Sequence, residues 1–167
     1  PDTSSADQAW NTTTYAPQNL GSNTRGVRFN VSTLAVTQPF IEVSFDLRSS
    51  NSVSKFFQVA YTTDGTNFTN LGTTSATGGD TWSNGYLFTL PANDTTKSAD
   101  FGIRILAIFD PALGNAYSPA NPTVSYATSG TARFDMVRIG QSAVPEPASM
   151  AVLGLGLAAL KRRRRNG

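Results

Sequence analysis

Short runs in which apolar and polar residues alternate constrain the fold of this chain more than any other feature. In the run FIEVSFDL, at 40–47, the apolar residues Ile41, Val43, Phe45 and Leu47 occupy every second position. A period of two places these residues on one face of a β-strand, whereas a helix would spread them around its circumference. The run therefore predicts a half-buried strand with a polar outer face.

Turn signals separate further segments of this kind. The residues Asp64 and Gly65 lie between the segments 55–62 and 67–72, which we expect to form an antiparallel hairpin because glycine tolerates the positive φ of a tight turn. A second pair, Asn84-Gly85, predicts a turn before a strand that begins at Tyr86.

One segment is apolar on both faces. Residues 101–109 contain a single charged side chain, Arg104, which indicates a central strand covered on both sides. A closing strand with Phe134 pointing inward is predicted near residues 131–139. Roughly eight or nine strands and no helical period before residue 148 predict an all-β fold, an antiparallel β-sandwich.

The chain divides into three parts on this basis. Residues 1–25 are a polar lead-in that contains a candidate edge strand, and residues 26–143 form the β-sandwich domain. Residues 144–167 differ in composition from both and end in a short hydrophobic helix with a basic tail.

Histidine and cysteine are both absent from the 167 residues. Their absence excludes disulfides, thiolate nucleophiles, Ser-His-Asp triads and zinc sites with the usual ligands. Glycosidases need two carboxylates at most roughly 9.5 Å apart, but Glu42 and Asp46 would lie roughly 13 Å apart along one strand. The only other glutamate is Glu146, in the C-terminal part. We therefore predict a non-enzymatic protein without a cofactor.

The positive charge of the chain is confined to its C-terminal part. Residues 1–143 contain 8 Lys+Arg and 10 Asp+Glu, whereas residues 144–167 contain 5 and 1. A nucleic-acid-binding domain presents Lys and Arg across a face that follows the phosphates. The slightly acidic main part of the chain therefore argues against nucleic acid as a partner.

Residues 148–160 form an uncharged and mostly apolar run of 13 residues, directly followed by Lys161 and four arginines. As a helix the run would be roughly 20 Å long, shorter than the ~30 Å hydrocarbon core of a bilayer. The basic cluster after it is typical of a segment that stays on the cytoplasmic side. A core helix or an amphipathic helix is the alternative, but it fits poorly because the run has no polar face.

The motif VPEPAS, the apolar run and the arginine cluster, in this order, resemble the PEP-CTERM sorting signal of Gram-negative bacteria that make exopolysaccharide. The resemblance implies Sec export, a transient anchor in the inner membrane, recognition by an exosortase, and delivery to the cell surface or extracellular matrix. It assigns recognition to a sorting motif composed of Val144, Pro145, Glu146 and Pro147. It assigns membrane retention to Lys161, Arg162, Arg163, Arg164 and Arg165.

The segments VAYTTDGTNFTNLG and GTARFDMVRIG resemble jelly-roll modules of secreted bacterial proteins, some of which bind carbohydrate. Two functions follow as hypotheses. The first is a structural or matrix subunit of a biofilm or another extracellular assembly, with like subunits as partners. The alternative is a carbohydrate-binding module for exopolysaccharide, in which sugar rings would stack on Trp10, Trp82, Tyr86, Tyr117 and Tyr126.

A structural calcium ion is a further hypothesis, since calcium binds through oxygen ligands such as carboxylates. The weak candidates are the aspartates Asp64, Asp110 and Asp135. Isolated aspartates at turns more often cap the backbone than bind an ion.

Overall fold

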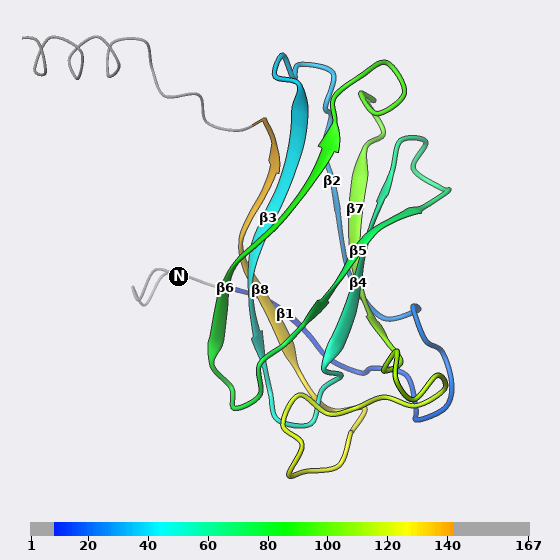
Figure 1. The fold of residues 1–167 in the computed structure, drawn as a ribbon, viewed down its shortest axis with the longest axis vertical. Coiled ribbons are helices and arrows are strands. Elements are labelled where there is room, and N and C mark those ends of the chain that lie inside the picture. Colours follow the sequence, from blue (N-terminus) through cyan, green and yellow to red (C-terminus); the bar gives the residue numbers. More distant parts are fainter. Residues whose placement is uncertain (1–8, 142–167) are drawn as a thin grey trace, which may run out of the picture.

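The structure, a computed structural model, describes residues 9–141 and consists of two antiparallel four-stranded sheets (Figure 1). One sheet has the strand order β1-β8-β3-β6 and the other β2-β7-β4-β5. The strands are β1 (Trp10–Thr12), β2 (Gly26–Asn30), β3 (Phe40–Ser49), β4 (Phe56–Thr62), β5 (Thr69–Ser75), β6 (Trp82–Pro91), β7 (Gly102–Ile108) and β8 (Ala132–Gly140). The predicted all-β class is confirmed, and no helix occurs within the described range.

The strand pairs are nested within one another. β4 pairs with β5, β3 with β6, β2 with β7 and β1 with β8, all antiparallel. The chain is thus one long hairpin that folds over to make two layers. Two further pairings, β3 with β8 and β4 with β7, complete the sheets. As predicted, β7 lies in the interior of its sheet, between β2 and β4. The expectation that both of its faces are covered is wrong, because buried residues alternate with half-buried ones from Ile103 to Ile108 and only the face toward the other sheet is fully covered.

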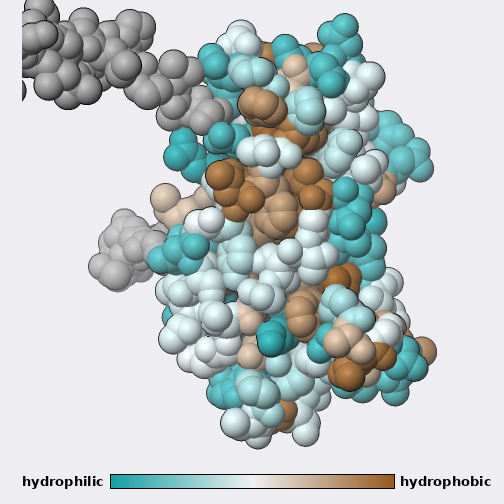
Figure 2. All heavy atoms as spheres, in the orientation of Figure 1, coloured by the Kyte–Doolittle hydropathy of each residue, from teal (hydrophilic) through white to brown (hydrophobic). Residues whose placement is uncertain are grey.

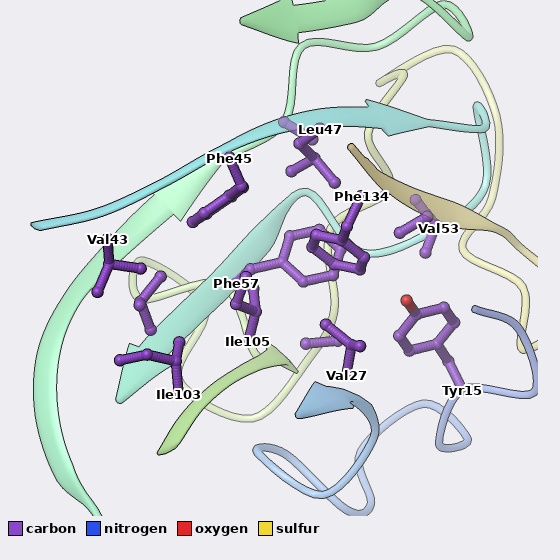
Figure 3. Close-up of a cluster of buried hydrophobic side chains, with 14 of the residues drawn as sticks. Tyr15, Val27, Val43, Phe45, Leu47, Val53, Phe57, Ile103, Ile105 and Phe134 are labelled. Atoms are coloured by element: carbon purple, nitrogen blue, oxygen red, sulfur yellow. The ribbon is translucent and has the colours of Figure 1, made fainter. Parts of the chain in front are cut away.

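The inner faces of the two sheets share a single core (Figure 3). The alternation in β3 is confirmed, because its four inward apolar side chains are at most 1 % exposed. Phe57 of β4 and Phe134 of β8 come from opposite sheets and meet edge to face, with ring centroids 6.2 Å apart. Phe134 also contacts Phe45 of β3. The fold is therefore a β-sandwich, as predicted.

The expectation of a turn at Asn84-Gly85 is wrong, because β6 continues through both residues. Phe45 lies opposite Tyr86 and Leu47 opposite Ser83, which leaves Asn84 and Gly85 opposite the single residue Asp46. Gly85 has a φ of 75° and its N–H donates to the Asp46 carboxylate at 2.7 Å. A bulge with a glycine in the left-handed region needs the same positive φ as a tight turn, so the local sequence could not separate the two.

The hairpin of β4 and β5 is confirmed, but its loop is longer than the Asp-Gly signal suggested. Residues 63–68 connect the strands, and β5 covers 69–75 instead of 67–72. Gly65 has the expected positive φ, 76°.

Within the described range no helix is long and apolar enough to cross a bilayer. The predicted C-terminal helix at 148–160 lies outside the described residues.

Replacing Phe134 by alanine should lower the free energy of unfolding by about 3–5 kcal/mol, since the ring fills the centre of the core. Urea denaturation followed by far-UV circular dichroism measures this loss. The matched control is Leu87→Ala in β6, where the side chain is 57 % exposed and a loss of at most about 1 kcal/mol is expected. Equal losses in the two variants would contradict the shared core.

Candidate functional site

The sorting motif, Val144 to Pro147, and the basic cluster, Lys161 to Arg165, lie outside the described residues. The described chain ends at Gln141, directly after β8. The Oε1 atom of Gln141 accepts hydrogen bonds from the backbone N–H of Thr37 at 3.0 Å and from its hydroxyl at 3.1 Å. These bonds fasten the end of β8 to the loop that precedes β3, three residues before the motif begins.

Two of the five predicted sugar-stacking aromatics cover the open edges of the sandwich. Trp10 on β1 is 61 % exposed and contacts Phe29 of β2 edge to face across one opening. Tyr86 on β6 stacks on Phe45, and its hydroxyl donates to the Ser75 carbonyl of β5 at 2.7 Å. The side chains of Trp10 and Tyr86 therefore cover the gaps between the edge strands of the two sheets.

Tyr117 and Tyr126 lie together in the long loop between β7 and β8. Their rings stack with centroids 4.5 Å apart, and the Tyr126 hydroxyl donates to the carbonyl of Ala16 at 2.6 Å. Burial raises the pKa of both phenols. Tyr117 is only 2 % exposed, so the structure places its ring in the core, where a sugar has no access. Backbone hydrogen bonds to 51–55, including Ala120 N–H to Val53, fold the loop inward.

Trp82 differs from these four because it belongs to an outer sheet face. Arg48 lies directly opposite both Trp82 and Arg133, and directly paired residues share a face of the sheet. Nε and Nη2 of Arg48 each donate to the Asp80 carboxylate at 2.9 Å, and Arg133 lies 4.0 Å from it. We name these four residues, Trp82, Arg48, Arg133 and Asp80, the outer-face cluster. An aromatic ring beside charged hydrogen-bonding groups suits a hydroxyl-rich ligand.

The three candidate calcium ligands lie on separate elements and serve as backbone caps. Asp64 accepts hydrogen bonds from the Asn67 side chain and from the N–H groups of Asn67 and Thr66 at 2.6–2.8 Å. Asp110 accepts from the hydroxyl of Ser118 and from the N–H of Ala112, which lower its pKa. Asp135 accepts from the N–H of Met136 at 2.7 Å. Between residues 9 and 141, no group of three or more acidic side chains converges to hold a metal ion.

Sequence reasoning missed a second cluster, on the outer face of the other sheet. Arg28 of β2 lies directly opposite Arg104 of β7, and both guanidiniums contact the ring of Phe68. The residues are distant in the sequence, and only the strand register brings them together.

Comparison with known proteins identifies the C-terminal part of the chain. A family model of the PEP-CTERM protein-sorting motif matches residues 143–165, which include the motif, the apolar run and the basic cluster. No curated protein and no solved structure gave a match. The resemblance to this signal is therefore confirmed. It implies an exported protein that is anchored transiently in the membrane and then processed by an exosortase.

Replacing Asp64 by asparagine should destabilise the protein at neutral pH and have less effect in acid. Hydrogen bonds, above all from the Asn67 side chain, hold the pKa of Asp64 well below its usual range. A lowered pKa contributes stability above the unfolded-state value of about 4, and this contribution is lost as the pH falls through the folded-state pKa. Melting temperatures of the wild type and D64N between pH 7 and pH 2 should therefore converge in acid. An unchanged difference across this range, or an equal effect of the control D94N, would contradict the capping role.

Proposed function

We propose that the protein is an exported, non-enzymatic component of the envelope or extracellular matrix, and that its sandwich is a structural subunit of an extracellular assembly such as a biofilm. The observation that carries the proposal is the PEP-CTERM motif at 143–165, which begins three residues after β8 ends at Gly140. The signal and the sandwich are thus adjacent in the sequence but do not overlap.

The nested strand order supports a jelly-roll-like class for the sandwich. Eight strands in two sheets, paired first with last and so on inward, follow the order expected of the doubled Greek key of a jelly roll. Jelly rolls have many unrelated functions, so the fold by itself assigns none.

The lack of histidine and cysteine in the whole chain supports a non-enzymatic role. The outer-face cluster contains a carboxylate, but Arg48 engages both oxygens of Asp80. Both oxygens of the carboxylate are therefore already occupied by the guanidinium of Arg48.

The edge strands favour a structural subunit over a sugar-binding module. Among the strands of residues 9–141, β6 is the longest edge strand, with 10 residues, and β3 is its only partner in the sheet. An edge of this length offers backbone donors and acceptors to a like subunit, and the bulge at Gly85 limits uncontrolled pairing. Leu87 on this strand and Phe40 on β3 are more than half exposed. Brown apolar atoms are also visible on the face shown in Figure 2.

Carbohydrate binding is the second candidate, and the outer-face cluster is the observation that favours it. The ring of Trp82 would stack on a pyranose while Arg48 and Arg133 donate to hydroxyl groups. The partner in that case would be exopolysaccharide.

Replacing Pro145, Glu146 and Pro147 by alanine should leave export intact and abolish processing. Export and membrane insertion depend on hydrophobicity and on the arginines, which this variant retains. Immunoblots of inner-membrane, surface and medium fractions should show an uncut precursor in the inner membrane. The control Ser142→Ala, outside the matched segment, should be sorted normally. If the triple variant reaches the surface at normal size and amount, the sorting role of the motif is wrong.

If the second candidate is correct, Trp82→Ala should abolish the retardation of the protein in native gels that contain the exopolysaccharide. Trp10→Ala is the matched control, because Trp10 covers the opening between β1 and β2. Equal retardation of both variants and the wild type would exclude stacking on Trp82. No retardation of the wild type would leave the structural role as the better account.

A further inference from the structure

Two arginines face each other on the outer surface of the second sheet. Arg28 and Arg104 are direct partners in the antiparallel register of β2 and β7. Like charges directly opposite on neighbouring strands destabilise a sheet unless an opposite charge compensates them. The ion pairs found among residues 9–141 join Arg48 and Arg133 to Asp80, and neither Arg28 nor Arg104 takes part in one. The pair therefore carries a positive charge that no ion pair within residues 9–141 neutralises.

Phe68 and two hydrogen bonds fix the guanidinium of Arg28. The Nε atom donates to the Asn30 side chain at 2.7 Å, and Nη2 donates to the Gly65 carbonyl at 2.8 Å. The guanidinium carbon lies 5.1 Å from the centroid of the Phe68 ring. Because these contacts already restrict the side chain, a ligand would pay little additional rotamer entropy on binding Arg28.

Arg104 is held against the same ring but has unsatisfied donors. Its guanidinium carbon lies 4.2 Å from the Phe68 centroid, and its Nε is buried without a hydrogen-bond partner. No hydrogen bond joins its two terminal amino groups to the described residues, and only Nε is buried in this way. A partly desolvated cation with open donors interacts more strongly with an anion than a fully hydrated arginine does.

Two acidic residues near this place limit the charge of a ligand. The backbones of Asp64 and Asp100 form an isolated parallel β-bridge beside Gly65, and neither carboxylate lies within ion-pair distance of the two arginines. The carboxylate of Asp64 is occupied by Asn67 and Thr66. The negative charges of Asp64 and Asp100 disfavour the binding of a compact dianion more than that of a singly charged group.

We propose that Arg28, Arg104 and Phe68 form a binding site for the singly charged oxyanion of an acidic saccharide, either a uronate carboxylate or a sulfate ester. Guanidinium groups match the planar, two-oxygen geometry of a carboxylate, and the ring supplies an apolar surface beside it. The oxyanion chemistry follows from the arginine pair. The choice of a saccharide rests on the proposed function, because an exported matrix protein meets such polymers.

Titration of the 15N-labelled full chain in nonionic detergent with trigalacturonate tests the site. The chemical shifts of backbone amides in 26–30, 66–70 and 102–106 should change together. Arg28→Gln and Arg104→Gln should each weaken binding at least tenfold. Arg28→Lys keeps the charge on an exposed residue and should still weaken binding, because it loses the forked geometry. Arg138→Gln is the matched control, since Arg138 pairs with Ser44 on the outer face of the other sheet.

Three further probes identify the ligand chemistry. A sulfated disaccharide that causes the same local changes supports the site and identifies a sulfate ester as an alternative source of the oxyanion. Maltotriose, which is neutral, should cause none of these changes, and inorganic phosphate should bind more weakly than trigalacturonate.

The proposal is overturned if the changes are confined to the basic cluster at 161–165, if R138Q weakens binding as much as R104Q, or if maltotriose binds equally well. This titration measures binding in vitro, whereas the motif variant measures processing in cells. Failure of either one is therefore distinguishable from failure of the other.

Discussion

The contact between Phe57 and Phe134 across the two sheets is the interaction on which the rest of the structure depends. Each sheet alone would expose an apolar face, and the chain has no cysteine to join the sheets covalently. Burial of the inner faces therefore supplies most of the stability. Phe134 belongs to β8, which lies between β1 and β3, so neither the core nor the first sheet is complete without this strand.

The position of β8 also explains how a sandwich and a sorting signal share one chain. Every strand of the sandwich precedes the matched segment, and Gln141 is tied to Thr37 just before the motif begins. The core that the structure describes is therefore formed by residues that precede the signal. The charges are divided in the same way, since the basic cluster lies in the signal and the sandwich part is slightly acidic.

The sequence predicted those features that depend on local periodicity. Alternation in β3, the apolar character of β7 and the signal of residues 144–165 could be read directly, because each depends on neighbouring positions. The sequence does not distinguish a turn from a bulge at Asn84-Gly85, since a bulge with glycine in the left-handed region and a tight turn require the same positive φ. The burial of Tyr117 and the meeting of Arg28 with Arg104 depend on how distant segments pair, and local pattern has no information on that register.

Peptide mapping by mass spectrometry of the mature protein, isolated from the surface or medium of its native cells, tests the central claim most directly. Removal of the signal predicts that peptides from the sandwich, up to residue 141, are present while peptides from the apolar run and the arginine cluster are absent. The inner-membrane fraction of the same cells should contain both sets. Recovery of the apolar run and the arginines in the mature surface protein would show that the signal is retained, and would contradict sorting by exosortase.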